Sequence, residues 1–127
     1  MIMMQETMAI ALGGALGSLC RYWFGGLVTY FLGSHFPYGT LLVNIVGSLL
    51  MGILYVLLIE KTHLPAIWRS VSIIGFMGAF TTFSTFSLQA FALFEESRFV
   101  AALVYVVVSV TVCILAAAAG VFATRQL

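Results

Sequence analysis

Charged residues are scarce in this chain of 127 residues: Asp, Glu, Lys and Arg together make up 7%, whereas hydrophobic residues make up 63%. Soluble domains carry about 25% charged residues, because these cover the surface that faces water. The net charge is +1, and the basic residues are spread along the sequence at Arg21, Lys61, Arg69, Arg98 and Arg125. No basic patch is available for the phosphate backbone of a nucleic acid. The composition therefore excludes a soluble domain and excludes nucleic acid as a partner.

Cysteine and histidine are also rare, with two residues of each type. Cys20 and Cys113 fall inside apolar stretches, where a free thiol behaves as a small hydrophobic residue, so we expect neither a disulfide framework nor a thiolate metal site. His35 and His63 lie in expected loops, and we interpret both as solvated side chains. No Lys or Arg precedes Arg21, whereas a signal peptide begins with positive charge, so we expect the first apolar segment to be a retained membrane span.

Long uncharged stretches are what the sequence does contain, at residues 22–59, 70–94 and 99–124. Each reaches the roughly 20 residues that a helix needs to cross a bilayer. The first stretch is too long for one crossing, and the turn-forming residues Gly33–Gly39 divide it. The four helices that we predict are Met8–Leu32, Gly39–Ile59, Trp68–Phe94 and Phe99–Ala123. The prediction is an all-α integral membrane protein with residues 1–127 in a single four-helix transmembrane domain and both termini on one side of the lipid bilayer.

The distribution of basic residues gives the spans almost no preferred orientation. Lys61, Arg69 and Arg125 lie on the side of the termini, and Arg98 lies on the other side together with Arg21, if the latter extends to its nearer surface. So small a bias permits insertion in both orientations and hence a dual-topology antiparallel homodimer. Four helices are also too few to enclose a polar path away from lipid, so we expect self-association.

Polar side chains repeat on one face of two predicted helices. Thr40, Asn44 and Ser48 are spaced by four in the second helix, and Tyr105 and Ser109, followed by Cys113, repeat the spacing in the fourth. Small residues also recur at this spacing, in the pairs Gly13 with Gly17 and Ser48 with Gly52, which favours close approach of helices. Polar groups are costly within a membrane, so these faces indicate either function or helix contacts.

The third helix carries the densest polar segment. Five hydroxyl side chains occur between Thr81 and Ser87, and they belong to Thr81, Thr82, Ser84, Thr85 and Ser87. Phe80, Phe83 and Phe86 recur at every third residue beside them. Gly75 and Gly78 weaken the helix just before this segment, so we expect a local break. A break frees backbone carbonyls, which are tolerated at membrane depth where they bind an ion, meet water or are buried in protein.

The chemistry of these side chains favours an anion over a cation. All acidic residues lie at span ends, and they are Glu6, Glu60, Glu95 and Glu96. Coupled cation exchange normally needs a carboxylate within the membrane. Amide and hydroxyl donors and the positive edges of phenyl rings can hold an anion without one. This pattern suits a small, poorly polarizable anion and leaves its identity open.

Three segments resemble the CrcB/Fluc family of bacterial fluoride channels, over essentially the full length of the chain. They are Gly13–Tyr22, Gly39–Ser48, and Gly75–Gly78 running into Thr81–Ser87. The resemblance implies a passive fluoride channel in the bacterial inner membrane that protects the cell from fluoride toxicity. It also implies an antiparallel homodimer of four-helix subunits in which both subunits build two fluoride pores.

The resemblance further implies roles for individual residues. The implied fluoride pore contains Asn44, the paired rings of Phe83 and Phe86, and a hydroxyl track of Ser84, Thr85, Tyr105 and Ser109. Backbone carbonyls of Gly78 and Thr81 from both subunits would hold a structural Na⁺ at the dimer interface, and Arg21 would raise the anion concentration in a vestibule. Two residues depart from the expected pattern: Gln89 replaces a glutamate of some relatives, and Cys113 replaces a hydroxyl.

Ordinary roles compete with these. A hydroxyl in a membrane helix commonly bonds a carbonyl one turn earlier, an asparagine can join helices, and phenylalanines usually pack or face lipid. The main rival function is a small dual-topology multidrug or cation transporter, which would need an intramembrane glutamate. A second is a non-conducting, holin-like oligomer, for which Asn44 would be dispensable. We expect no enzyme, because no nucleophile, base and orienting group converge.

Overall fold

The computed structural model describes residues 1–127, and all of its regular structure is helical. The elements in chain order are α1 (Ile2–Leu32), α2 (Tyr38–Tyr55), the π-helical η1 (Val56–Glu60), α3 (Ala66–Arg69), the π-helical η2 (Ser70–Met77), α4 (Gly78–Phe80), α5 (Phe83–Glu95) and α6 (Phe99–Arg125). They form four helical stretches that are long and apolar enough to cross a membrane, at Ile2–Leu32, Tyr38–Glu60, Ala66–Glu95 and Phe99–Arg125. The four predicted spans are therefore confirmed, and the first begins at Ile2 instead of Met8.

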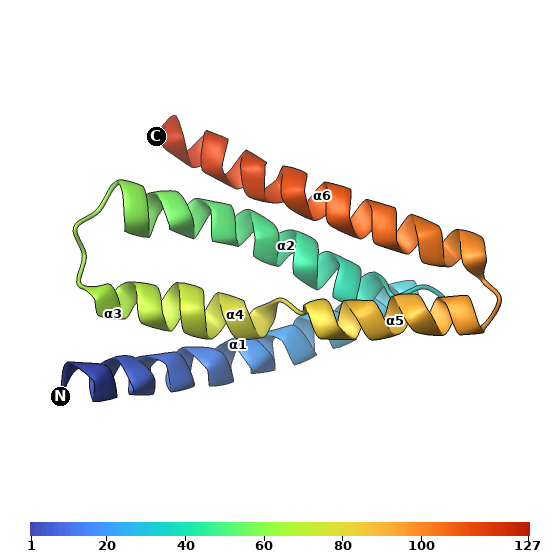
Figure 1. The fold of residues 1–127 in the computed structure, drawn as a ribbon, viewed down its shortest axis with the longest axis horizontal. Helices are drawn as coiled ribbons and strands as arrows, with labels where there is room; N and C mark the ends of the chain where they lie inside the picture. Colours follow the sequence, from blue (N-terminus) through green and yellow to red (C-terminus); the bar gives the residue numbers. More distant parts are fainter.

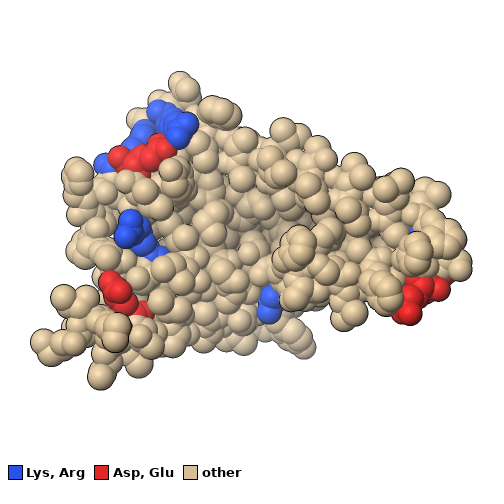
Figure 2. Space-filling model, in the orientation of Figure 1, with Lys and Arg blue, Asp and Glu red and all other residues tan.

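The four spans run lengthwise beside one another (Figure 1). Both termini lie at one end of the molecule, and the connections from α1 to α2 and from α5 to α6 lie toward the other end, as an even number of spans requires. Charged side chains gather at these two ends, with one further basic group between them on the face that Figure 2 shows. The rest of that face carries no charged residue, as expected of a surface that faces lipid.

Glycines bring the backbones of neighbouring spans into contact. A Cβ atom on Gly13 or Gly17 of α1 would overlap a carbonyl oxygen of η2, at Val71 or Phe76. A Cβ atom on Gly120 of α6 would likewise overlap the Leu49 carbonyl oxygen of α2. The predicted pair Gly13 and Gly17 therefore brings helices together within one chain.

Few side chains are buried inside a single chain: 22 of the 127 residues. Two small clusters make up the core. One lies between α2, α5 and α6 and consists of Leu41, Phe86, Leu93, Ala102 and Tyr105; the other consists of Val43, Met77 and Phe80. Such a thin core leaves large apolar side chains exposed on every span, which suits a lipid solvent.

The backbone leaves helical geometry in the middle of the third span. Helix α4 ends at Phe80, Thr81 and Thr82 are extended with ψ angles of 158° and 115°, and α5 begins at Phe83. The Thr82 hydroxyl caps α5 by accepting a hydrogen bond from the Thr85 N–H at 3.2 Å. This two-residue interruption exposes backbone polar groups that need partners elsewhere.

Candidate functional site

Asn44 on α2 pairs with the interruption of the third span. Its Nδ2 donates a hydrogen bond to the Thr82 carbonyl oxygen at 3.0 Å, and its Oδ1 accepts one from the Thr82 N–H at 2.8 Å. Both backbone groups of an extended residue are thereby satisfied within the membrane. A side-chain amide carries two hydrogens on nitrogen, so one hydrogen of Asn44 is left for another acceptor. The amide therefore joins two spans and still offers a donor.

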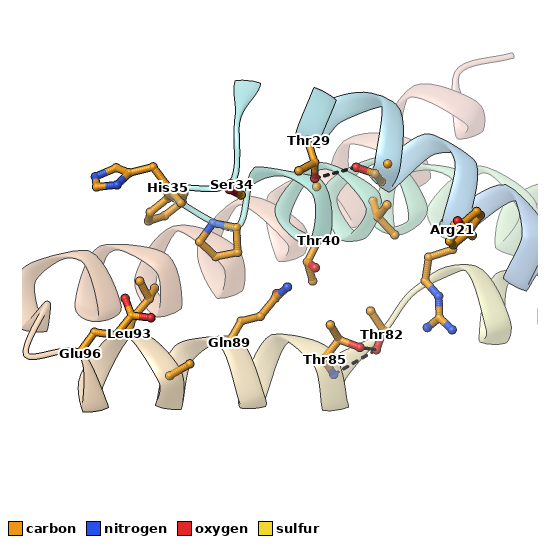
Figure 3. Close-up of a pocket in the computed structure, with 18 of the residues that line it drawn as sticks. Arg21, Thr29, Ser34, His35, Thr40, Thr82, Thr85, Gln89, Leu93 and Glu96 are labelled. Carbon is orange, nitrogen blue, oxygen red and sulfur yellow. Dashed lines mark hydrogen bonds between the residues drawn. The ribbon is translucent and has the colours of Figure 1, made fainter. Parts of the chain in front are cut away.

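Two hollows lie beside this pair, and Thr82 lines both. The Asn44 hollow, of about 360 Å³, has polar lining residues Asn44, Ser48, Thr81, Thr82, Ser109 and Cys113. The Arg21 hollow, of about 550 Å³, has Arg21, Thr40, Thr82, Thr85, Gln89 and Arg98 among its lining residues (Figure 3). The interruption thus stands between a mainly neutral hollow and one that holds two arginines.

Ser109 contributes a buried hydroxyl to the Asn44 hollow. Its side chain is 5% exposed, and its Oγ has no hydrogen-bond partner in the protein. A buried polar group without a partner costs about 1 to 3 kcal/mol. The hydroxyl is therefore available to a ligand that enters the hollow. Cys113, one turn further along α6, lines the same hollow with a weaker S–H donor.

Phe83 and Phe86 both line the Asn44 hollow but lie in different environments. Phe86 is 7% exposed and packs on Tyr105 with ring centroids 5.1 Å apart, whereas Phe83 is 76% exposed. The two rings meet at a centroid distance of 5.4 Å and an interplanar angle of 56°. Within one chain, Phe86 is a core residue and Phe83 projects from the surface.

The hydroxyls of the third span divide into two groups. Thr81 donates to the Met77 carbonyl oxygen at 3.0 Å and Ser87 donates to that of Phe83 at 2.9 Å, so these two follow the ordinary pattern of bonding one turn back. The other three lie together: the Thr82 Oγ1 donates to Thr85 Oγ1 at 3.0 Å and lies 3.5 Å from Ser84 Oγ. Thr85 also lines the Arg21 hollow, whereas Ser84 lines neither hollow.

Tyr105 lies in the protein core beside Phe86. It is fully buried, and its hydroxyl donates to Gln89 Oε1 at 2.9 Å. Tyr105 lines neither the Asn44 hollow nor the Arg21 hollow. Gln89 extends from α5 toward Thr40 across the Arg21 hollow (Figure 3). Because its carbonyl oxygen accepts from Tyr105, its amide hydrogens remain for the hollow.

Arg21 reaches the Arg21 hollow from α1. Figure 3 shows it at one end of the hollow, with His35 and Glu96 at the other. No hydrogen bond or ion pair holds its guanidinium within the chain. A half-buried arginine without a carboxylate partner leaves its charge free to act on anions in the hollow.

The carbonyl groups of Gly78 and Thr81 both lack their helical donors. In a continuous helix they would accept from the N–H groups of Thr82 and Thr85. The first of these N–H groups instead donates to Asn44, and the second donates to the Thr82 hydroxyl. Gly78 is also exposed, and a Cβ atom there would meet only the Ile73 carbonyl oxygen, at 3.8 Å. Carbonyl oxygens are ligands of the kind that a hard cation such as Na⁺ accepts.

Sequence analysis missed some members of the site. Thr82 received no role separate from the other hydroxyls, although its position three residues before Thr85 is typical of a helix N-cap and marks the start of α5. His35 and Arg98 also line the Arg21 hollow. They come from separate loops, and no local sequence signal joins them.

Comparisons with known proteins identify relatives along nearly the whole chain. The chain is 47% identical over 119 residues to the fluoride-specific ion channel FluC of Methylococcus capsulatus. The aligned residues make up 94% of this chain and 52% of that protein. It is 45% identical to the protein of the same name from Hahella chejuensis, over 91% of each chain. It is 43% identical to that of Geobacter sp. strain M21, over 98% of this chain and 100% of the relative. The chain thus spans about half the length of the Methylococcus relative and most or all of the other two.

A family model supports the same relationship. Residues 8–121 match the model described as CrcB-like protein, Camphor Resistance (CrcB). This match includes the second and third spans in full and most of the first and fourth, and it confirms the resemblance that the segments around Asn44 and Phe83 indicate. The chain is a multi-pass membrane protein, and it belongs to the CrcB family.

Proposed function

We propose that this protein is a fluoride-selective channel that passively exports cytoplasmic F⁻ and so protects the cell from fluoride toxicity. The names of its relatives support fluoride as the ion. The structural observation that carries the proposal is the Asn44 hollow, in which a spare amide hydrogen and the unpartnered Ser109 hydroxyl lie beside two phenyl rings. These groups suit an anion that has lost its water.

The proposed pore contains Asn44, Phe83, Phe86, Ser84, Thr85, Tyr105 and Ser109. All of its groups can present positive charge to an anion: amide and hydroxyl hydrogens, and the edges of aromatic rings. No carboxylate lines the Asn44 hollow. This lack of an exchangeable negative charge argues against a multidrug or cation transporter.

A second copy of the chain completes the pore. The Asn44 hollow opens at the surface where Phe83 is 76% exposed, and polar groups there would meet lipid if the chain were alone. An antiparallel homodimer covers this surface, and the weak charge bias of the loops permits the inverted orientation. Twofold symmetry then produces two equivalent pores.

A structural Na⁺ would be held at the dimer interface by the carbonyl oxygens of Gly78 and Thr81 from both copies. The support is that both oxygens lack helical donors. Four carbonyl oxygens suit a hard cation, and the ion would supply a positive charge near the pores. Arg21 would add a second positive influence by concentrating anions in the Arg21 hollow.

Acid–base chemistry gives the channel its role in the cell. Fluoride crosses membranes as the neutral acid from an acidic exterior and ionises in the more neutral cytoplasm. In the inner membrane the negative interior potential drives the anion outward with about 2.3 kcal/mol per 100 mV. No ATP and no coupled ion are needed.

An efflux assay tests the proposal. Liposomes that contain the protein are loaded with potassium fluoride or potassium chloride, valinomycin is added to carry K⁺, and the anion released is measured with an ion-selective electrode. We expect rapid fluoride release and chloride release close to that of protein-free liposomes. Equal release of the two anions, or no fluoride release above the protein-free level, would contradict the proposal.

A further inference from the structure

Two loops meet at the end of the molecule opposite the termini, and they bring His35 against Arg98. His35 lies between α1 and α2, and Arg98 lies immediately before α6. The distance from His35 Nε2 to a terminal guanidinium nitrogen of Arg98 is 3.2 Å. A guanidinium can only donate hydrogen bonds, so Nε2 must be the acceptor and the imidazole must be neutral. Protonation of His35 would replace this hydrogen bond with repulsion between two cations.

The pair is accessible to water and to ions. His35 is exposed, and both residues line the mouth of the Arg21 hollow. Both also line a third hollow of about 620 Å³ on the outer face of α2 and α6. The hydrogen-bonded pair thus forms part of the wall between two hollows, and a proton can reach the imidazole without entering the membrane.

Other charged groups at this mouth set the balance of charge. Glu96, immediately after α5, forms an ion pair with Arg98 at 3.5 Å, and Arg21 of α1 faces the same hollow. Two arginines and one glutamate give the hollow a net charge of +1 when His35 is neutral and +2 when it is protonated. Tyr22 and Tyr38 are the other titratable residues that line these hollows.

We propose that His35 and Arg98 form a pH-sensitive anion-capture site at the mouth of the Arg21 hollow. Neutral His35 accepts a hydrogen bond from the Arg98 guanidinium and keeps it against the lining of the hollow. Protonated His35 cannot accept this bond, so the guanidinium is free, and the positive charge that faces an incoming anion doubles. Histidine is the side-chain type that commonly changes its charge between about pH 5 and pH 8. The inference rests on the proposed anion channel and adds a regulation that the conduction mechanism does not require.

The expected size of the effect follows from electrostatics. A unit charge about 8 Å from an anion in water changes the local anion concentration by about two- to threefold. Fluoride flux should therefore rise by about this factor between pH 7.5 and pH 5.5 at low ionic strength, and the rise should disappear in high salt. The fluoride flux would thus rise under acidic conditions, which are the conditions in which fluoride enters cells as the neutral acid.

Fluoride efflux from proteoliposomes tests the site, with equal pH on both sides and the protein-free rate at each pH subtracted. His35→Gln keeps an acceptor for Arg98 but cannot be protonated, so its flux should stay at the wild-type pH 7.5 level at both pH values. His35→Arg should show the higher wild-type pH 5.5 flux at both, a gain that misfolding cannot produce. His63→Gln is the matched control at the opposite end of the molecule and should respond as the wild type does.

The outcomes separate this inference from the proposed function. Wild-type flux that is equal at the two pH values, or a His35→Gln variant that keeps the wild-type rise, would overturn the His35 site while leaving the channel intact. Loss of the rise in His63→Gln would place the pH-sensitive group at the end of the molecule that holds the termini, and this result would also overturn the His35 site. No fluoride flux above the protein-free level at either pH would overturn the channel itself.

Discussion

The side-chain amide of Asn44 and the backbone of Thr82 form a reciprocal pair of hydrogen bonds, 3.0 and 2.8 Å long, across two membrane spans. This pair explains how a two-residue interruption is tolerated at membrane depth, since it supplies the partners that the helix no longer provides. It also fixes the amide beside the Asn44 hollow with one hydrogen to spare. In the proposed channel, structure and conduction therefore depend on the same side chain.

Replacing Asn44 should impair both stability and flux. Asn44→Ala leaves the Thr82 N–H and carbonyl without partners, so we expect a loss of about 1 to 3 kcal/mol in the free energy of unfolding, together with loss of fluoride flux. Ser48→Ala, one turn along the same helix face, is the control and should fold normally. Thermal unfolding in detergent and fluoride efflux measure the two effects. Normal flux from Asn44→Ala would favour a non-conducting or merely structural role.

Ser109 offers a test in which stability and function should separate. Because its buried hydroxyl has no partner, Ser109→Ala should leave the melting temperature unchanged or slightly raised. The same variant should lower fluoride flux, since it removes a donor from the Asn44 hollow. Cys113→Ser should act in the opposite direction, because a hydroxyl is a stronger donor than a thiol. Unchanged fluoride flux in both variants would show that this face of α6 does not line the pore.

The two phenylalanines should differ in stability but agree in flux. Phe86→Ile alters a ring that is 7% exposed within its own chain, so it should measurably lower the melting temperature. Phe83→Ile alters a ring that is 76% exposed within its own chain, so any loss of stability would come from the surface that the second copy covers. If ring edges conduct the anion, each variant should lower flux by about tenfold, equivalent to about 1.4 kcal/mol of barrier. Size-exclusion chromatography checks that both still assemble. Flux at the wild-type rate in both would refute conduction along the ring edges.

The hydropathy pattern could predict the four spans, because a lipid solvent demands about 20 apolar residues for each crossing. The pairing of Asn44 with Thr82 could not be predicted, since the two residues are 38 positions apart and either could have bonded within its own helix. The meeting of His35 and Arg98, 63 positions apart, depends in the same way on tertiary packing. The π-helical turns at Val56–Glu60 and Ser70–Met77 were also not predicted, because hydrophobic periodicity does not distinguish them from α-helix.

Contacts between spans through glycine predict a sharp difference between two alanine substitutions. Gly120→Ala places a Cβ atom against the Leu49 carbonyl oxygen, so α2 and α6 must separate, at a cost of about 1 to 3 kcal/mol. Gly26 lies in α1, and a Cβ atom added there would have no neighbour within 4 Å, so Gly26→Ala should stabilise the helix by about 0.5 to 1 kcal/mol. Thermal unfolding in the same detergent compares the two. Equal effects would show that the close approach is not required.

Removal of sodium should weaken the dimer. If the carbonyl oxygens of Gly78 and Thr81 from two copies hold Na⁺, replacing Na⁺ by N-methyl-D-glucamine throughout purification should shift the protein toward monomer and lower its melting temperature. Light scattering reports the mass of the complex. A dimer that is equally stable without Na⁺ would leave these two unpaired carbonyls without the proposed ligand.

We expect the groups around Asn44 and Phe83 to pass fluoride and to reject chloride. The reversal potential across a planar bilayer measures this selectivity, with potassium fluoride on one side and an equal concentration of potassium chloride on the other. We expect a large reversal potential, of the sign set by fluoride flux alone. A reversal potential near zero would show that the two anions pass equally well and would contradict this expectation.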